Sequence, residues 1–185
     1  MLTAKQEVQL SKYMSLILRH TPEQYGIVLD ARDGSCPLEE LVHVLREQKG
    51  WSDITEADIR QVVEQSDKQR FEINDNRIKA RYGHSHTQVQ YEQGTPPAIL
   101  YHGTHEQAVT AIEQQGLLPM NRQYVHLSAS THFAELAGKR RGSLVLLQVD
   151  TVQAIAEGVT FYFAGHEVWL SGPIPAYCLT RVAKG

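Results

Sequence analysis

Two short segments of the chain each place a histidine beside small and hydroxyl-bearing residues. Residues 100–104 read Leu-Tyr-His-Gly-Thr, residues 124–128 read Tyr-Val-His-Leu-Ser, and both are apolar runs typical of β-strands. We therefore expect His102 and His126 at matching positions on two strands. Two imidazoles with hydroxyl groups nearby, and a glycine that lets a ligand approach the backbone, favour a ligand-binding cleft.

A second group of candidates is cationic, and most of it lies before residue 85. Arg19 and His20 come at the end of an apolar helical stripe, where they also suit the ordinary role of complementing the helix dipole. An arginine guanidinium matches phosphate oxygens through paired hydrogen bonds, and a histidine exchanges its proton near neutral pH. Positive charge placed here favours phosphate contact over base reading. The residues that supply it are Arg19, Lys68, Arg70, Arg77, Lys79 and Arg81.

Two helices are expected before residue 50. Apolar residues spaced as a helical stripe from Leu10 to Leu18 predict the first helix, which Pro22 ends. The second helix begins after a turn at residues 33–35, and Gly50 closes it.

A third helix and a β-hairpin complete this half. Thr55 to Asp58 resembles a capping box that opens a helix, and residues 70–81 alternate around a turn at residues 74–76. Three helices followed by a hairpin predict a winged-helix module. Its third helix carries acidic residues against Arg60 alone, so we do not expect it to read the DNA major groove.

A polar stretch over residues 83–97 separates the two halves and places the domain boundary between residues 92 and 93. His84 and His86 lie in this stretch, but no third ligand follows at a recognised spacing. We therefore predict no metal site.

The second half alternates short strands with short helices. Strands are expected at residues 99–101, 125–127, 144–149, 161–163, 168–170 and 177–179, and helices at residues 107–115 and 131–138. No strand is followed by the glycine fingerprint of a Rossmann site, and there is no Walker A motif. Both of those nucleotide-binding designs are excluded.

The composition is that of an ordinary folded protein. Of 185 residues, 42% are hydrophobic and 21% are charged, and the net charge is -3. Any RNA contact therefore requires a local basic patch. Cys36 and Cys178 fit no metal or redox spacing, so we expect two reduced, buried thiols. With no signal-like start and no apolar run of about 20 residues, we expect a cytoplasmic protein without a membrane segment. We also expect a monomer.

Six motifs follow one another along the chain. They are Leu18-Arg19-His20-Thr21, Asp67-Lys68-Gln69-Arg70-Phe71, Gly83-His84-Ser85, Tyr101-His102-Gly103-Thr104, Val125-His126-Leu127-Ser128 and Gly138-Lys139-Arg140-Arg141-Gly142. Together, and in this order, they resemble the RNA 2′-phosphotransferases of the KptA type. The resemblance runs from about Leu10 to Leu179.

The resemblance implies an α+β fold with two lobes. Residues 1–92 would form a winged-helix RNA-binding lobe, and residues 93–185 an ADP-ribosyltransferase-like NAD-binding lobe. The implied reaction, associated with tRNA splicing, transfers an internal RNA 2′-phosphate to NAD. An RNA-2′-phospho-ADP-ribose intermediate forms as nicotinamide leaves, and ADP-ribose 1″,2″-cyclic phosphate is then released. NAD is a co-substrate, and no metal is implied.

The resemblance also assigns site residues by motif. The implied catalytic set is Arg19, His20, Arg70 and Arg140, with Arg141 as the alternative to Arg140. The implied NAD-binding residues are His102, Gly103, Thr104, His126, Leu127 and Ser128. The implied RNA-binding residues are Lys68, Arg77, Arg81, His84 and Ser85.

The residue types fit this chemistry. The first step needs no general base, because the attacking RNA phosphate is already an anion. Where protein-modifying ADP-ribosyltransferases carry a glutamate, the matching position is Val168, and a shift of one residue would make it Glu167. The second step builds negative charge that fixed arginines stabilise, and we expect His20 to protonate the departing RNA 2′-oxygen.

Two other functions remain open. An ADP-ribosyltransferase acting on protein or on nucleic-acid terminal phosphates would stop after the first step. A non-enzymatic winged-helix binding module would not consume NAD, and the acidic third helix fits that function poorly.

Overall fold

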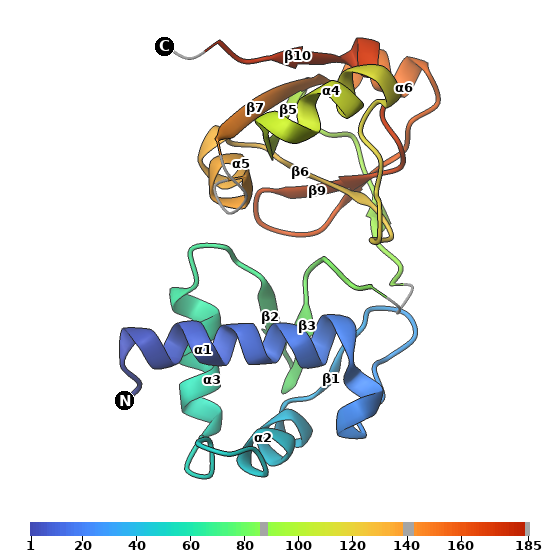
Figure 1. Cartoon of the computed structure of the whole chain (residues 1–185). Helices are drawn as coiled ribbons and strands as arrows, with labels where there is room; N and C mark the ends of the chain where they lie inside the picture. The colour runs from blue at the N-terminus through green and yellow to red at the C-terminus, as the bar shows by residue number, and fades with distance from the viewer. Residues whose placement is uncertain (86–88, 139–142, 184–185) are drawn as a thin grey trace. The chain divides into compact units, whose positions relative to one another are not determined.

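The computed structural model describes residues 1–85, 89–138 and 143–183, which form two compact units (Figure 1). The first unit is Met1–Gln90 and the second is Tyr91–Gly185. The described residues contain six α-helices and two antiparallel sheets, which confirms the α+β class. The boundary predicted between residues 92 and 93 would divide β4 (Glu92–Gln93), which pairs within the sheet of the second unit.

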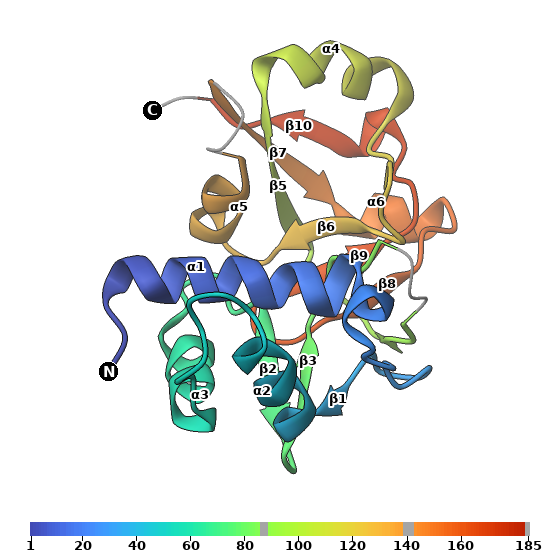
Figure 2. The same cartoon turned by 60° about the horizontal axis from the view of Figure 1, so that its bottom comes forward.

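The first unit combines three α-helices with a three-stranded sheet (Figure 2). Its helices are α1 (Ala4–Ser15), α2 (Leu38–Arg46) and α3 (Glu56–Gln65). Its strands are β1 (Cys36–Pro37), β2 (Phe71–Asn74) and β3 (Arg77–Ala80), in the order β1-β3-β2. Apolar side chains from all three helices and from the hairpin share one core, because each helix buries a single stripe.

The first predicted helix changes its winding part-way along. α1 ends at Ser15, and Leu16–His20 form a π-helical turn closed by a 3.0 Å bond from the Thr21 amide to the Leu16 carbonyl. The Thr21 hydroxyl donates to the same oxygen at 3.2 Å. Turns of this kind often occur at functional sites, and here the last two residues are the arginine–histidine pair.

The predicted hairpin and third helix are confirmed. Asp75 and Asn76 have φ values of 46° and 59°, as a two-residue hairpin turn with left-handed central residues requires. Thr55 caps α3 by accepting from the Asp58 amide at 3.3 Å, and the Asp58 carboxylate accepts from the Thr55 amide at 3.0 Å. This reciprocal pair is a capping box with aspartate in place of glutamate.

The second helix is shorter than predicted. It ends at Arg46 and does not reach Gly50. Arg46 Nε donates to the Ile54 carbonyl at 2.8 Å, so its side chain ties down the loop that leads to α3. Gly50 lies in that loop with a φ of 89°.

The second unit is built on a seven-stranded antiparallel sheet. Its strands besides β4 are β5 (Ile99–His105), β6 (Val125–Ser128), β7 (Leu144–Asp150), β8 (Phe161–Phe163), β9 (Val168–Ser171) and β10 (Leu179–Arg181). The order is β10-β7-β5-β6-β9-β8-β4. Its helices are α4 (Glu106–Gln115), α5 (Thr131–Gly138) and α6 (Thr151–Ala156). The strand predicted at residues 177–179 is wrong over its first two residues, because a 3-10 turn at Ala176–Cys178 precedes β10.

Helices cover both faces of β5 and β7 (Figures 1 and 2). On one face, Leu100 and Val149 pack in a core with Val109 of α4 and Ala154 of α6. On the other face α5 comes so close that a Cβ added at Gly103 would overlap the backbone of α5. Glycine is therefore required at this position for helix and strand to pack.

The structure bears on two further expectations, one for the cysteines and one for membrane-spanning helices. Cys36 and Cys178 are both buried and unbridged. In the part of the chain that the structure describes, no helix is both long enough and apolar enough to cross a bilayer.

Candidate functional site

Arg19 is buried against two aromatic rings of the first unit. Its exposed fraction is 9%, and its guanidinium carbon lies 4.9 Å from the centre of the Tyr82 ring and 5.9 Å from that of Phe71. A guanidinium within about 6 Å of an aromatic face is attracted by the ring's electron density. The rings therefore restrict where the charge of Arg19 can lie.

The segment 82–85 contacts both members of the arginine–histidine pair. Gly83 has a φ of 90°, and a Cβ there would lie 3.3 Å from Arg19 Nε. The Ser85 amide donates to the Arg19 carbonyl at 2.9 Å, and Ser85 Oγ lies 2.5 Å from His20 Nδ1. The motif of glycine, histidine and serine thus holds Arg19 through its backbone and His20 through its ring.

Arg70 is tied to the same helix that leads to Arg19. Its Nη1 donates to Ser11 Oγ at 3.2 Å, and Ser11 is buried in α1. Motif reasoning does not identify Ser11. The signal that marks it is a polar residue beside Leu10 at the start of an apolar stripe, about two helical turns before Arg19.

The loop before Arg70 is also fixed. Gln69 has a φ of 41°, which is uncommon for a residue with a side chain. Its amide and its Nε2 both donate to the Ser66 carbonyl at 3.0 Å. The Tyr82 hydroxyl donates to the carbonyl of Lys68 at 2.8 Å. Arg70 therefore enters β2 from a loop of defined shape.

Two of the predicted RNA-binding arginines make contacts within the first unit. Arg77 Nε donates to Ser35 Oγ at 2.9 Å, and its Nη2 donates to the Ser35 carbonyl at 3.1 Å. Arg81 Nη1 lies 3.1 Å from a carboxylate oxygen of Glu72, and its Nε donates to the Phe71 carbonyl at 3.2 Å. Arg77 remains exposed and Arg81 is half-buried, so only part of each side chain meets solvent.

His84 lies inside the first unit. Its exposed fraction is 3%. Burial lowers the pKa of its imidazole to about 4, and the charges of Arg19 and His20 lower it further. His84 is therefore a neutral residue packed behind the arginine–histidine pair at neutral pH.

In the second unit, His102 and His126 lie on neighbouring strands. The link between them runs from ring to backbone, because His102 Nδ1 lies 2.8 Å from the carbonyl oxygen of His126. Burial lowers the pKa of His102, and the nearby charge of Arg122 lowers it further. A neutral ring that donates from Nδ1 to a carbonyl must carry its lone pair on Nε2.

Arg122 is a residue that the motifs do not single out. Its Nη1 lies 2.6 Å from His126 Nδ1. Because a guanidinium only donates, His126 Nδ1 must be the acceptor, and the ring proton must be on Nε2. These contacts therefore assign different tautomers to the two rings, with the proton on Nδ1 in His102 and on Nε2 in His126.

A chain of hydroxyl contacts follows β6. Ser128 Oγ donates to the Ser130 carbonyl at 2.8 Å, and Ser130 Oγ donates to Glu167 Oε2 at 2.8 Å. Val168 pairs with Ser128 across β6 and β9 and is 4% exposed. Val168 is therefore the residue of β9 that lies opposite Ser128, and the carboxylate of the neighbouring Glu167 accepts a hydrogen bond from Ser130.

The remaining predicted site residues divide into three cases. Gly103 lies against the backbone of α5. Thr104, Leu127 and Ser128 are all buried, and Leu127 belongs to the core of the second unit. Arg140 and its alternative Arg141 lie outside the described residues.

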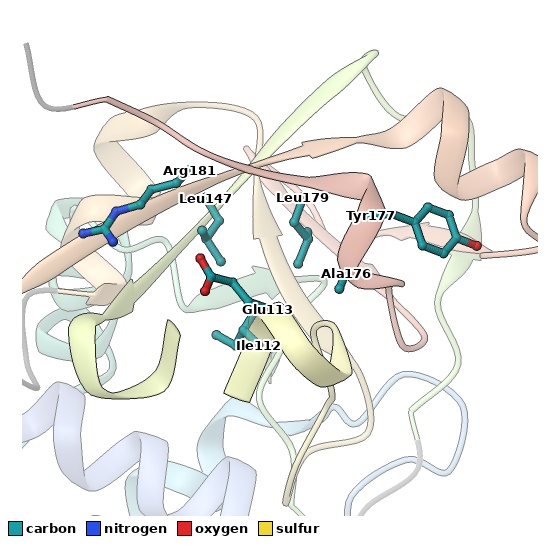
Figure 3. Close-up of a pocket in the computed structure, with 7 residues that line it drawn as sticks. All are labelled: Ile112, Glu113, Leu147, Ala176, Tyr177, Leu179 and Arg181. Carbon is teal, nitrogen blue, oxygen red and sulfur yellow. The ribbon is translucent and has the colours of Figure 1, made fainter. Parts of the chain in front are cut away.

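A cavity of about 370 Å³ lies at another place in the second unit (Figure 3). Its lining consists of Ile112, Glu113, Leu147, Ala176, Tyr177, Leu179 and Arg181. None of the predicted site residues lines it, so it is not part of the candidate site. Among the described residues, no group of three or more His, Cys, Asp or Glu side chains is arranged to hold a metal ion.

Comparison with known proteins decides the family. A family model described as "RNA 2'-phosphotransferase, Tpt1 / KptA family" matches residues 5–172, which span α1 to β9. The chain belongs to this family. The matched range contains the arginine–histidine pair, Arg70, His102 and His126.

Curated relatives support the Tpt1/KptA assignment over nearly the full length. Proteins named "Probable RNA 2'-phosphotransferase" from Acetivibrio thermocellus and Bacillus thuringiensis subsp. konkukian are 44% and 43% identical to the chain. The first alignment covers 91% of this chain and 93% of the relative, and the second covers 90% and 91%. A protein of the same name from Pyrococcus horikoshii is 37% identical, covering 94% of this chain and 98% of the relative.

Proposed function

We propose that this chain is an NAD-dependent RNA 2′-phosphotransferase. It would transfer an internal RNA 2′-phosphate to NAD through an RNA-2′-phospho-ADP-ribose intermediate, releasing nicotinamide and ADP-ribose 1″,2″-cyclic phosphate. The observation that carries the proposal is the anchoring of Arg19, His20 and Arg70 to one helix in a chain of this family. Two fixed guanidinium groups with a histidine beside them are suited to a phosphoryl group.

We assign the first unit to RNA and describe it as a winged helix. Three helices and a hairpin flanked by β1 support this architecture. Lys68, Arg77, Arg81 and Ser85 are its proposed RNA contacts. His84 is 3% exposed, so we give it a supporting role behind Arg19 instead of direct RNA contact.

We assign the second unit to NAD and describe it as ADP-ribosyltransferase-like. The tautomers of two neighbouring histidines support this co-substrate, because the acceptor nitrogen of His102 suits a ribose hydroxyl. When bound, NAD supplies the ribose carbon to which the phosphate is transferred, with nicotinamide as the leaving group. Thr104, Leu127 and Ser128 are the other proposed NAD contacts, whereas the side of Gly103 that we expected a ligand to approach is filled by the backbone of α5.

The residue at the position matching the glutamate of protein-modifying ADP-ribosyltransferases supports an anionic group as the nucleophile that attacks NAD. A neutral acceptor needs a carboxylate to remove its proton, whereas a phosphate does not. Val168 is apolar and buried, and Glu167 is engaged by Ser130. This arrangement favours RNA phosphate over a protein side chain as the nucleophile.

The second half of the reaction depends on the first unit and on Arg140. Arg19 and Arg70 are proposed to stabilise charge on the phosphoryl group, a type of contact that typically contributes about 3 to 4 kcal/mol. His20 is proposed to protonate the departing RNA 2′-oxygen. Ser85 holds the ring at Nδ1, which restricts the orientation of the imidazole.

The test uses an oligoribonucleotide with one internal 2′-phosphate, followed by chromatography with and without NAD. We expect NAD-dependent loss of the 2′-phosphate and formation of nicotinamide and a cyclic-phosphate product. Accumulation of ADP-ribosylated RNA would show that only the first step occurs. Unchanged NAD and unchanged RNA would overturn the proposed function, and the same RNA without its 2′-phosphate is the matched control.

A further inference from the structure

Tyr82 contacts two parts of the first unit that belong to different segments of sequence. Its ring faces the guanidinium of Arg19, with 4.9 Å between the guanidinium carbon and the ring centre. Its hydroxyl donates to the carbonyl of Lys68 at 2.8 Å. One side chain therefore links the π-helical turn to the loop before Arg70.

The loop that receives this hydroxyl has a strained backbone. Gln69 adopts a φ of 41° between Lys68 and Arg70. Such a conformation costs roughly 1 to 3 kcal/mol and persists only when neighbouring contacts impose it. The bond from Tyr82 to the Lys68 carbonyl, together with the bonds from Gln69 to Ser66, supplies those contacts.

The other ends of both arginines are also held. The Arg70 guanidinium donates to Ser11 in α1, and the Arg19 carbonyl accepts from the Ser85 amide. With these points fixed, the Tyr82 ring and hydroxyl couple the direction of the Arg19 side chain to the loop before Arg70, and the Phe71 ring at the start of β2 adds a second, more distant contact. A residue that only filled space would need neither a flat face nor a hydroxyl.

We propose that Tyr82 is a positioning residue that sets the Arg19 guanidinium relative to the loop carrying Arg70. The inference rests on the proposed function, because it assumes that both arginines act on one phosphoryl group. Misplacement of a catalytic group by about 1 Å can lower a rate by roughly 100-fold. Tyr82 would therefore affect the rate of phosphoryl transfer without touching RNA or NAD.

The two parts of the side chain can be separated by two variants. Tyr82→Phe keeps the ring over Arg19 and removes the bond to Lys68, whereas Tyr82→Leu removes both. Tyr25→Phe and Tyr25→Leu are the matched controls, because Tyr25 lies in the same unit and its ring and hydroxyl contact Tyr13. The thermal unfolding midpoints of all four variants show how much stability each substitution costs, so that losses of activity can be compared at similar stability.

The first readout does not require activity. In NMR spectra of protein labelled with ¹⁵N, the Arg19 Nε–Hε signal, assigned through Arg19→Lys, should show an aromatic ring-current shift. We expect this shift to persist in Tyr82→Phe and in both Tyr25 variants, and to fall clearly in Tyr82→Leu to what the more distant Phe71 ring causes. An Arg19 signal that does not move in Tyr82→Leu would overturn the proposed contact.

The second readout is turnover of the 2′-phosphorylated oligoribonucleotide. We expect kcat to fall roughly 10- to 100-fold in Tyr82→Leu and less in Tyr82→Phe, with KM for NAD unchanged in both. If Tyr82→Leu and Tyr25→Leu lost kcat equally at equal unfolding temperatures, Tyr82 would act only through packing and the proposal would be wrong. An inactive wild type would overturn the proposed function and the catalytic part of this inference, while the NMR result would still decide the contact.

Discussion

The ring of His102 on β5 reaches the backbone of β6, where its Nδ1 lies 2.8 Å from the carbonyl oxygen of His126. Within the described residues, β5 and β6 pair only at Tyr101 and Ser128. The side chain of His102 therefore links β5 to β6 at a position where their backbones no longer pair. It also fixes the position of the peptide that carries His126.

Arg122→Gln should weaken NAD binding more than it slows the reaction. The change replaces the charged donor to His126 Nδ1 with a shorter, neutral side chain, so it weakens the contact that selects the tautomer of this ring. A hydrogen bond to a charged group contributes on the order of 1.5 to 3 kcal/mol, and we expect KM for NAD to rise about tenfold. The measurement is steady-state kinetics with varied NAD.

Arg181→Gln is the control for Arg122→Gln. It removes the surface ion pair with Glu106 in the same unit, so KM for NAD should stay at the wild-type value. Equal KM values for NAD in wild type and Arg122→Gln would contradict the role given to Arg122.

Ser11→Ala should slow phosphoryl transfer while leaving the fold intact. The variant removes the acceptor for Arg70 Nη1 in the middle of α1. A poorly held guanidinium gives up part of its transition-state contact, and we expect a single-turnover rate about tenfold below wild type. Ser15→Ala makes the same chemical change one helical turn later and should have no such effect. A normal rate in Ser11→Ala would show that Arg70 needs no support from α1.

Stability should fall as the pH is lowered from about 6.5 to about 4, because of His84. The pKa of His84 is about 4 in the folded chain, against an ordinary value of 6.5. Between these values the unfolded chain binds a proton that the folded chain does not, so acid favours unfolding. The contribution is at most about 3 kcal/mol; it is complete above pH 6.5 and lost by about pH 4.

Urea unfolding of wild type, His84→Gln and His43→Gln across this pH range checks the assignment. His84→Gln should be less stable at pH 7 and should depend less on pH. His43 is an exposed residue of α2, so its replacement should keep the wild-type pH dependence. Parallel pH curves for wild type and His84→Gln would refute the prediction.

Gly103→Ala should destabilise the second unit. The added methyl group would overlap the carbonyl of Ala134 in α5, and overpacking costs about 1 to 3 kcal/mol or more. Thermal unfolding followed by Trp169 fluorescence in a Trp51→Phe background reports on the second unit, and we expect a midpoint several degrees lower. Gly172→Ala is the control, because nothing lies within 4 Å of a Cβ there. A wild-type midpoint in Gly103→Ala would mean that α5 moves away freely.

Elements whose structure depends on residues close together in the sequence could be predicted from the sequence alone. The turn at Asp75 and Asn76 and the capping box of Thr55 and Asp58 are local features, and both are confirmed. The apolar stripe of α2 is confirmed too, although its end is not. At its end, Arg46 contacts the Ile54 carbonyl eight residues on, a contact that hydrophobic periodicity does not reveal.

The features of the candidate site that escaped prediction are set by tertiary contacts. The π-helical turn that carries Arg19 changes the winding of the helix without changing its hydrophobic pattern. Strand register decides that His102 meets the backbone of His126 and not its ring. Ser11 and Arg122 become visible only when distant segments are brought together, because neither belongs to a motif.

Each compact unit is made from one continuous stretch of chain, and this affects folding during synthesis. Every helix and strand of the first unit lies before Gln90, so this unit can fold while the ribosome is still adding the second. The second sheet is completed late, because its last strand, β10, covers the outer side of β7. Until β10 emerges, β7 has an unpaired edge that is open to strands of other nascent chains. The order of synthesis therefore places the risk of aggregation on the second unit.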